Sequence, residues 1–237
     1  MRRSISIIIP AFNEEKRLPS TLRAVEAYLG ATSWEFSEII LVDDGSRDGT
    51  VEVARRAGVR VLQNPGNRGK GFSVRHGMLE AQGDWALFTD ADLSSPIDEL
   101  EKLWSAISKE DAQAAIGSRD LDRSLIGVRQ PLFRELGGRA FNLSMRIITG
   151  LPFHDTQCGF KLFERKAARE IFRRQLLERF GFDVEILYIA QSLGYRIAEV
   201  PVRWNDVAGT KVKMTAAIAA FLDPVKVRWN GIAGKYR

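Results

Sequence analysis

The first half of the chain alternates short apolar runs with amphipathic segments of helical period, and this alternation constrains the fold more than any other feature. We expect strands at 4–9, 36–42, 59–63, 85–89 and 112–117, and helices at 18–29, 50–57, 71–81 and from 96 onward. Strands that alternate with single helices favour an α/β fold with a mostly parallel central sheet flanked by helices.

Glycine, serine and proline predict where the helices begin and end. Gly30, Gly58 and Gly83 would end the first three helices, because glycine adopts the backbone conformation that closes a helix. Ser95 would cap the start of the fourth helix, with Pro96 in its first turn. Each helix would then connect two strands of one sheet.

The alternation breaks after residue 120. A helical segment around 131–149 is followed by a strand at 159–163, helices near 164–173 and 183–193, a strand at 195–202 and an amphipathic helical tail from 207. We find no internal repeat and no linker. A chain of 237 residues that is 45% apolar is long enough to bury one full core, so we expect a single domain over residues 1–237.

The cysteine content and the lengths of the apolar runs predict where in the cell the protein is located. The single cysteine, Cys158, excludes an intrachain disulfide and is typical of a reducing compartment. We expect no signal peptide, and the longest late apolar run, 214–222, is shorter than the roughly 20 residues of a spanning helix. The sequence therefore predicts a cytoplasmic protein.

Basic charge is concentrated in two segments. Residues 123–150 carry five arginines against one glutamate, and residues 203–237 carry seven lysines and arginines against two aspartates. Because the whole chain is only +5, the remainder is net acidic. The basic segments are also rich in Leu, Ile, Phe and Trp, which favours peripheral contact with an anionic membrane. No nucleic-acid-binding signature is present, so we expect no nucleic-acid partner.

Two aspartates, Asp90 and Asp92, stand at the end of the fourth expected strand. Side chains two residues apart on a strand share a face, so both carboxylates can aim at one point. Such oxygen ligands suit Mg²⁺ or Mn²⁺ on a diphosphate. An isolated pair of this kind is more often a solvated acidic turn, but its place at a strand end of a parallel sheet favours a metal site.

The loops after the first three strands, 10–15, 43–50 and 64–71, are polar and glycine-rich. Carboxylates in the first two suit a base and a ribose, whereas Arg68, Lys70 and Arg75 suit phosphates. Gly71 stands where a Walker A loop needs Ser or Thr, and no G-x-G-x-x-G follows the first strand. These absences count against a P-loop or a nicotinamide or flavin dinucleotide fold.

Eight motifs together resemble family 2 glycosyltransferases. They are Ile-Ile-Ile-Pro-Ala-Phe-Asn-Glu at 7–14, Val-Asp-Asp-Gly-Ser at 42–46, Asn-Arg-Gly-Lys-Gly at 67–71, Asp-Ala-Asp at 90–92, Gly-Ser-Arg at 117–119, Asp-Thr-Gln-Cys-Gly-Phe-Lys-Leu-Phe at 155–163, Gly-Phe-Asp-Val-Glu-Ile-Leu at 181–187 and Glu-Val-Pro-Val-Arg-Trp at 199–204. The second half resembles the polyprenyl-phosphate branch, nearest the dolichyl-phosphate β-glucosyltransferases. The resemblance covers roughly residues 4–213, and the run at 155–163 is its most specific part.

This resemblance implies a GT-A type, Rossmann-like fold with amphipathic C-terminal helices. It implies a nucleotide-sugar-binding half at about 1–120 and an acceptor and membrane-facing half at about 121–237. The implied reaction is an inverting, metal-dependent transfer of a hexose, foremost glucose from UDP-glucose, to dolichyl or undecaprenyl phosphate. The implied location is the cytosolic face of a membrane, with peripheral attachment.

The resemblance also implies roles for individual residues. Those that would bind the donor are Pro10, Phe12, Glu14, Val42, Asp43, Asp44, Lys70, Ala91 and Ser94. Asp90 and Asp92 would hold the metal, and Ser94 stands where related mannosyl enzymes carry a glutamine ligand. Arg119 and Arg134 would grip the acceptor phosphate, with Arg139 near them.

The chemistry of a phosphate acceptor reduces the need for a catalytic base. A lipid phosphate is already anionic near pH 7, whereas a sugar hydroxyl needs deprotonation. Asp155 is open to three roles: base, substrate ligand or structural cap. One alternative function, transfer to a sugar or protein hydroxyl, would require such a base. Another, a non-catalytic nucleotide-sugar-binding module, is disfavoured by the Asp90 and Asp92 pair.

Overall fold

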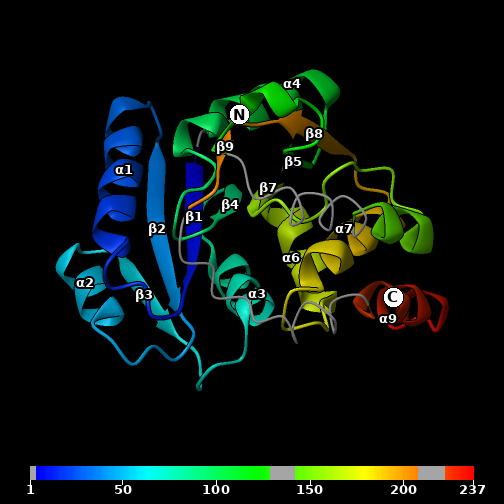
Figure 1. The fold of residues 1–237 in the computed structure, drawn as a ribbon, viewed down its shortest axis with the longest axis horizontal. Coiled ribbons are helices and arrows are strands. Elements are labelled where there is room, and N and C mark those ends of the chain that lie inside the picture. Colours follow the sequence, from blue (N-terminus) through cyan, green and yellow to red (C-terminus); the bar gives the residue numbers. More distant parts are fainter. Residues whose placement is uncertain (1–3, 129–141, 208–221) are drawn as a thin grey trace.

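A computed structural model of the chain describes residues 4–128, 142–207 and 222–237. Its centre is a seven-stranded sheet with the order β3-β2-β1-β4-β7-β5-β8 (Figure 1). The strands are β1 (Ser4–Ala11), β2 (Phe36–Asp43), β3 (Arg60–Gln63), β4 (Trp85–Thr89), β5 (Ala114–Ser118), β7 (Phe160–Glu164) and β8 (Ile197–Pro201). Neighbouring strands are parallel except at β7, which runs antiparallel to both β4 and β5. The expected mostly parallel sheet is confirmed.

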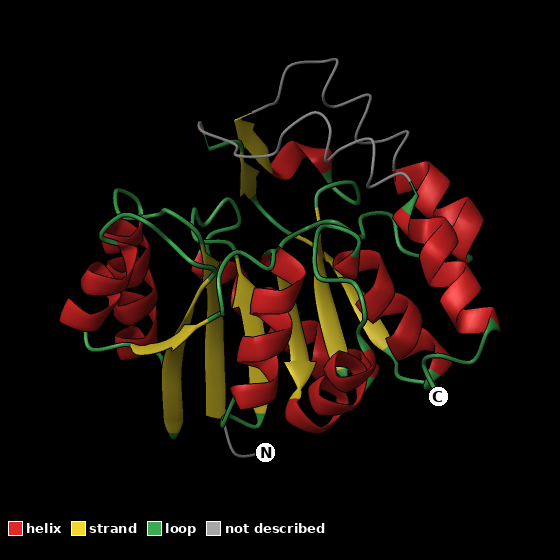
Figure 2. Cartoon of the chain, turned by 90° about the horizontal axis from the view of Figure 1, so that it is seen from below, coloured by secondary structure: helices red, strands yellow, loops and turns green. Residues whose placement is uncertain are grey.

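Helices cover both faces of this sheet (Figures 1 and 2). The helices of the described ranges include α1 (Leu18–Ala31), α2 (Thr50–Arg56), α3 (Lys70–Glu80), α4 (Leu100–Glu110), α6 (Arg165–Arg174), α7 (Phe182–Ser192) and α9 (Asp223–Ile232), with short 3₁₀ turns η1 (Ile97–Glu99) and η2 (Arg123–Leu125). Helices α1, α2 and α4 share one core with the sheet, whereas α3, α6 and α7 share the other. A separate pair of strands, β6 (Ile126–Val128) and β9 (Trp204–Asn205), lies outside the main sheet.

The apolar run of β1 forms a central strand because both of its faces are buried. Ile5, Ile7 and Ile9 pack into the core beneath α1 and α4, while Ile8 packs into the core beneath α3. All four side chains are fully buried. A strand that is apolar on both faces is typical of a parallel sheet covered by helices on each side.

Several helix boundaries differ from the expectations. Gly30 lies inside α1, which ends one residue later. Gly58 follows α2 with φ of +73°, so its expected role is confirmed. Gly83 does not end α3, which stops at Glu80; a Cβ at this position would lie 2.6 Å from the carbonyl carbon of Ile5. Gly83 therefore serves a close backbone approach to β1.

The expected cap at Ser95 is also wrong. Its hydroxyl lies 3.8 Å from the Cys158 sulfur, and the chain after Pro96 first forms the 3₁₀ turn η1 before α4 begins. Both side chains are buried, so Ser95 is used in packing against the 155–163 segment instead of capping a helix. Cys158 is a free thiol.

The second half adds strands to the same sheet as the first. Residues 142–149 are helical, and the earlier part of the expected 131–149 helix lies outside the described residues. Most of the expected tail helix also lies outside them, but α9 is present and packs against α7. No helix in the described ranges has the length and apolar character needed to cross a membrane.

Candidate active site

The polar loops expected to bind a ligand lie at one end of the sheet. In Figure 2 the amino end of β1 is at the lower edge, so the carboxyl ends of the parallel strands are at the upper edge, where loops gather. This is where open α/β sheets bind ligands. Asp90, Asp43 and Arg119 all directly follow or end strands at this edge.

Asp90 and Asp92 lie in a turn, because β4 ends at Thr89. The Leu93 amide donates to the Asp90 carbonyl, and Leu93 has φ of +47°. Asp92 Oδ1 accepts hydrogen bonds from the amide and the hydroxyl of Ser94, each 2.9 Å long. Turn geometry, and not strand alternation as expected, thus sets the directions of the two carboxylates.

Lys70, the first residue of α3, forms an ion pair with Asp90, with 2.5 Å between Nζ and Oδ1. Burial lowers the pKa of Lys70, but attraction to Asp90, Asp183 and Asp92 outweighs burial and raises that pKa. Lys161 lies nearby and is fully buried, and its Nζ is 2.5 Å from Asp183 Oδ1. The positive charges of Lys70 and Lys161 therefore offset the negative charges of Asp90, Asp92 and Asp183.

The carboxylate pair fits a divalent cation. The backbone of Gly159 lies against Asp90, and a Cβ there would overlap Asp90 Oδ2, so glycine leaves the room that this carboxylate occupies. Carboxylate oxygens are hard ligands, as Mg²⁺ and Mn²⁺ prefer. Within the described ranges no group of three or more His, Cys, Asp or Glu side chains is arranged to hold a metal. Asp90 and Asp92 would thus supply only part of a coordination shell.

Two buried carboxylates shape the loops expected to bind the nucleoside. Asp44 accepts hydrogen bonds from the Arg68 amide (2.9 Å), the Gly69 amide (2.8 Å) and the Asn64 side chain (2.9 Å). Asp43 accepts from the Ser46 amide at 3.2 Å. Both oxygens of Asp44 are used within the protein, so its contacts point to holding the 64–71 loop in place.

The other expected donor residues differ in exposure. Pro10, Phe12 and Glu14 are half-buried at and beyond the end of β1. Val42 and Ala91 are buried, and the Val42 side chain packs in the core beside α3, which leaves only its backbone near the site. Arg134 and Arg139 lie outside the described residues.

Arg119 directly follows β5 and is held by Asp155. Arg119 Nε donates to Asp155 Oδ2 at 2.6 Å, Nη2 donates to Oδ1 at 2.9 Å, and the Arg119 amide donates to Oδ2 at 3.1 Å. Its guanidinium carbon lies 5.5 Å from the centre of the Trp204 ring. A bidentate pair of this type fixes the plane of the guanidinium.

Asp155 is fully buried and remains ionised. Burial raises the pKa of this carboxyl, but the charge of Arg119 and hydrogen bonds from Arg119 and the Gln157 amide outweigh burial and lower the pKa to about 2. The Asp155 charge in turn raises the pKa of Arg119 above its usual value. Of the three roles left open for Asp155, these contacts favour the structural one over that of a base.

Sequence reasoning did not single out Lys161, Asp183, Glu199 or Trp204 individually. Each lies in one of the motifs that carried the resemblance, and Lys161 had a further signal, since it interrupts an otherwise apolar strand. Their partners are distant in sequence, and no local pattern identifies them.

Comparison with known proteins gives consistent matches over nearly the whole chain. Residues 6–172 match the family model described as Glycosyl transferase family 2. A dolichyl-phosphate beta-glucosyltransferase from Drosophila melanogaster is 41% identical over 88% of this chain and 69% of its own. The proteins of that name from Homo sapiens and Saccharomyces cerevisiae are 37% and 33% identical, over 89% and 98% of this chain and 70% and 76% of their own.

A solved structure matches the fold. Glucosyl-3-phosphoglycerate synthase from Mycobacterium tuberculosis, crystallised with Mn²⁺, UDP-glucose and phosphoglyceric acid, has a TM-score of 0.70 and is 19% identical. The match covers 99% of this chain and 80% of the other. At this identity the likeness concerns the fold.

Proposed function

Since the chain belongs to glycosyltransferase family 2, we propose that it transfers glucose from UDP-glucose to a polyprenyl phosphate. Three relatives that match 88% or more of the chain are named dolichyl-phosphate beta-glucosyltransferases, and this supports a polyprenyl phosphate as the acceptor. One structural observation carries the proposal. At the carboxyl ends of the strands, Asp90 and Asp92 lie beside Lys70, and Arg119 is held by ionised Asp155.

The donor diphosphate would bind at Asp90, Asp92 and Lys70. Mg²⁺ or Mn²⁺ held by the two aspartates would neutralise negative charge on the leaving diphosphate. Lys70 stands at the amino end of α3, where its ammonium group and the first amides of the helix both favour a phosphate. Asp44 would act on the donor indirectly, because it holds the Arg68 and Gly69 amides directly before Lys70.

The acceptor phosphate would bind at Arg119. A phosphate oxygen attacks the anomeric carbon from the side opposite the diphosphate, and the bond from that carbon to the diphosphate oxygen breaks, so the nucleoside diphosphate leaves with the electron pair. No proton has to be removed from an anionic acceptor. Asp155 therefore stays ionised throughout and keeps Arg119 in place.

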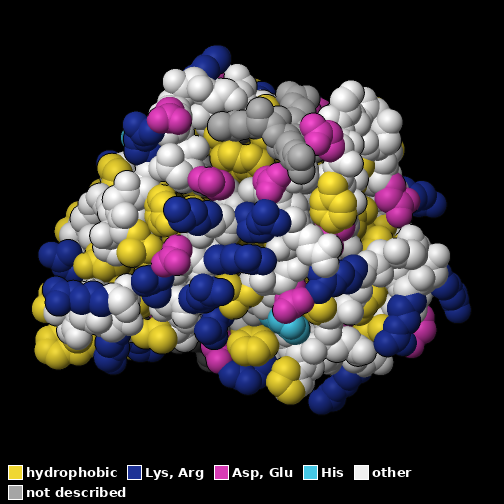
Figure 3. Space-filling model, turned by 180° about the vertical axis from the view of Figure 1, so that it is seen from behind, with side chains coloured by type: hydrophobic (Ala, Val, Ile, Leu, Met, Phe, Trp, Pro, Cys, Tyr) yellow, Lys and Arg dark blue, Asp and Glu magenta, His cyan; other side chains and the backbone are white. Residues whose placement is uncertain are grey.

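The enzyme would attach peripherally to the cytosolic face of a membrane. Val225, Trp229 and Ile232 are exposed along α9, as is Leu222 directly before the helix. Lys226 and Arg228 lie between these apolar positions. On the side of the molecule that lies behind the view of Figure 1, Lys and Arg side chains are mixed with apolar and acidic ones (Figure 3). Apolar side chains that insert and basic ones that contact anionic headgroups are the chemistry of an interfacial helix.

A transfer assay tests this function. The purified chain is incubated with UDP-glucose, GDP-mannose or UDP-N-acetylglucosamine, and with dolichyl phosphate, undecaprenyl phosphate or a sugar hydroxyl acceptor. We expect glucose in the lipid fraction, loss of transfer with EDTA, and recovery with Mg²⁺ or Mn²⁺. Transfer only to the hydroxyl acceptor, or only from another donor, would overturn the proposal.

A further inference from the structure

Glu199 lies on β8, the edge strand next to β5, and its carboxylate accepts hydrogen bonds from the backbone amides of His154 and Asp155. Its Oε1 accepts from the amides of His154 and Asp155, each at 2.9 Å. Its Oε2 lies 3.0 Å from both the amide and the Nδ1 of His154. One carboxylate thus fixes two successive amides and a side chain.

The Glu199 contacts continue to Arg119 without a break. The Asp155 amide is held by Glu199, and the Asp155 carboxylate holds the Arg119 guanidinium in a bidentate pair. Trp204, five residues after Glu199, lies over the same guanidinium. The segment from β8 to β9 therefore holds Arg119 at two points, through Asp155 and through the Trp204 ring.

We propose that Glu199 is a positioning residue for the acceptor phosphate, acting through Asp155 on Arg119. This inference rests on the proposed function, in which Arg119 binds that phosphate. Because an arginine that binds a phosphate has to be aimed within a fraction of an ångström, loss of the Glu199 contacts lowers acceptor use without touching the donor.

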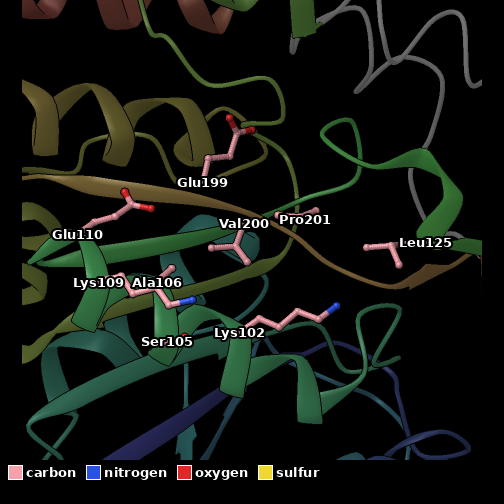
Figure 4. A pocket seen from close by; sticks show the side chains of 9 residues that line it. All are labelled: Lys102, Ser105, Ala106, Lys109, Glu110, Leu125, Glu199, Val200 and Pro201. Carbon is pink, nitrogen blue, oxygen red and sulfur yellow. The ribbon is translucent and has the colours of Figure 1, made fainter.

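A neighbouring glutamate provides a matched control. Glu199 and Glu110 both line a cavity of about 400 Å³ between α4 and β8 (Figure 4). The Glu199 side chain in that view points away from Lys102 and Lys109. Glu110 is exposed at the end of α4, and the described part of the chain offers its side chain no hydrogen-bond partner. Glu110→Gln removes the same charge from the same cavity.

Steady-state kinetics with each substrate varied separately test the proposal. Glu199→Ala should raise the KM for polyprenyl phosphate about tenfold, as expected when the Asp155 amide loses a charged hydrogen-bond acceptor and Arg119 is held less firmly. It should leave the KM for UDP-glucose within about twofold. Glu199→Gln should be intermediate, because its amide oxygen still accepts from the Asp155 amide. Glu110→Gln should match the unmodified enzyme. An equal rise in both KM values would overturn the proposal.

A double-mutant cycle identifies the route. In an Asp155→Asn background, Glu199→Ala should add little further loss, because the link to Arg119 is already weakened. Independent, additive losses would contradict a path through Asp155.

A readout without substrate separates this inference from the proposed function. The Arg119 Nε–H resonance, assigned with Arg119→Lys, should exchange slowly with solvent and faster in Glu199→Ala, but not in Glu110→Gln. Faster exchange in an enzyme that does not use lipid phosphate would retain the coupling and reject the function. Unchanged exchange would reject the coupling itself.

Discussion

Single residues at the strand ends decide what chemistry the site can perform. Asp155 has the residue type of a general base, but its oxygens accept from Arg119 and the Gln157 amide, and its pKa is lowered to about 2. A carboxylate that is already ionised and fully paired stabilises an arginine instead of accepting a proton. This agrees with an acceptor that arrives without a proton to lose.

The Asp155 pair predicts a pH-dependent stability. Its pKa is about 2 in the folded protein against 3.8 for a free side chain, so its stabilisation is complete above pH 4 and is lost as pH falls toward 2. Asp155→Asn should lower the free energy of unfolding by about 2 kcal/mol at pH 7, and the difference should shrink below pH 4.

Urea unfolding at several pH values measures this difference. Asp98→Asn, which removes an exposed ion pair with Arg203, is the control and should cost less than about 1 kcal/mol. A constant difference between Asp155→Asn and the unmodified protein down to pH 2 would contradict the lowered pKa.

Replacing Lys70 should have opposite effects on metal binding and on donor binding. Its ammonium group occupies Asp90 Oδ1, so a divalent cation and Lys70 compete for the same carboxylate. Lys70→Met should raise the affinity of the free protein for Mn²⁺ by about tenfold or more, since a nearby positive charge is removed. It should weaken UDP-glucose binding, because a phosphate contact is lost.

Electron paramagnetic resonance of Mn²⁺ and calorimetry with UDP-glucose give the two affinities. Lys109→Met removes an equal charge from an exposed position and should change neither. A parallel fall in both affinities would indicate that Lys70 supports the fold and does not compete with the cation.

At the scale of elements, the sequence predicted every strand of the main sheet to within a few residues, because continuous apolar runs and helical periods are local signals. The GT-A type fold is confirmed. The errors arose where a glycine or serine serves a distant contact. Gly83 makes room for β1 and Ser95 meets Cys158, and neither partner is visible from neighbouring residues.

The candidate site was predictable in position but less so in its contacts. The Asp90 and Asp92 motif and the polar loops were read from strand ends, yet the pair of Arg119 and Asp155 joins residues far apart in the chain. The same holds for Lys161 with Asp183. Long-range pairing depends on how β7 and β8 enter the sheet, which local periodicity does not encode.

Helix α9 carries the prediction for membrane contact. Neutralising Lys226 and Arg228 to Gln should weaken sedimentation with anionic vesicles about tenfold or more, at roughly 1 kcal/mol for each charge. Trp229→Ala should weaken it too, since Trp229 is 67% exposed and would insert its ring. Phe36→Ala, an exposed aromatic at the start of β2, is the control. Equal binding to neutral vesicles, unaffected by salt, would contradict the electrostatic part.

For the whole molecule, the two expected halves share one sheet. Strand β7 lies between β4 and β5, although those strands are close together in the chain. The core beneath α3 is completed by α6 and α7. A single domain over the whole chain remains a prediction, and these shared elements support it.

Truncation tests that prediction. Residues 1–120 alone lack β7 and β8 and keep only α3 of the helices that cover one face, because α6 and α7 come later in the chain. We therefore expect no cooperative urea transition in the fragment, whereas the full chain should unfold in one step. Circular dichroism follows both. A sharp transition in the fragment would identify the first half as a domain of its own.

The inserted strand β7 also sets an order of events during synthesis on the ribosome. Strands β4 and β5 emerge early but have no pairing with each other in the finished sheet, and their common neighbour is made only about forty residues after β5. Until then the nascent chain exposes one unpaired edge of β4 and both edges of β5, all of nearly uncharged sequence, which are sites for aggregation or chaperone binding. The enzyme's yield in a cell should therefore depend on how quickly the ribosome passes from β5 to β7.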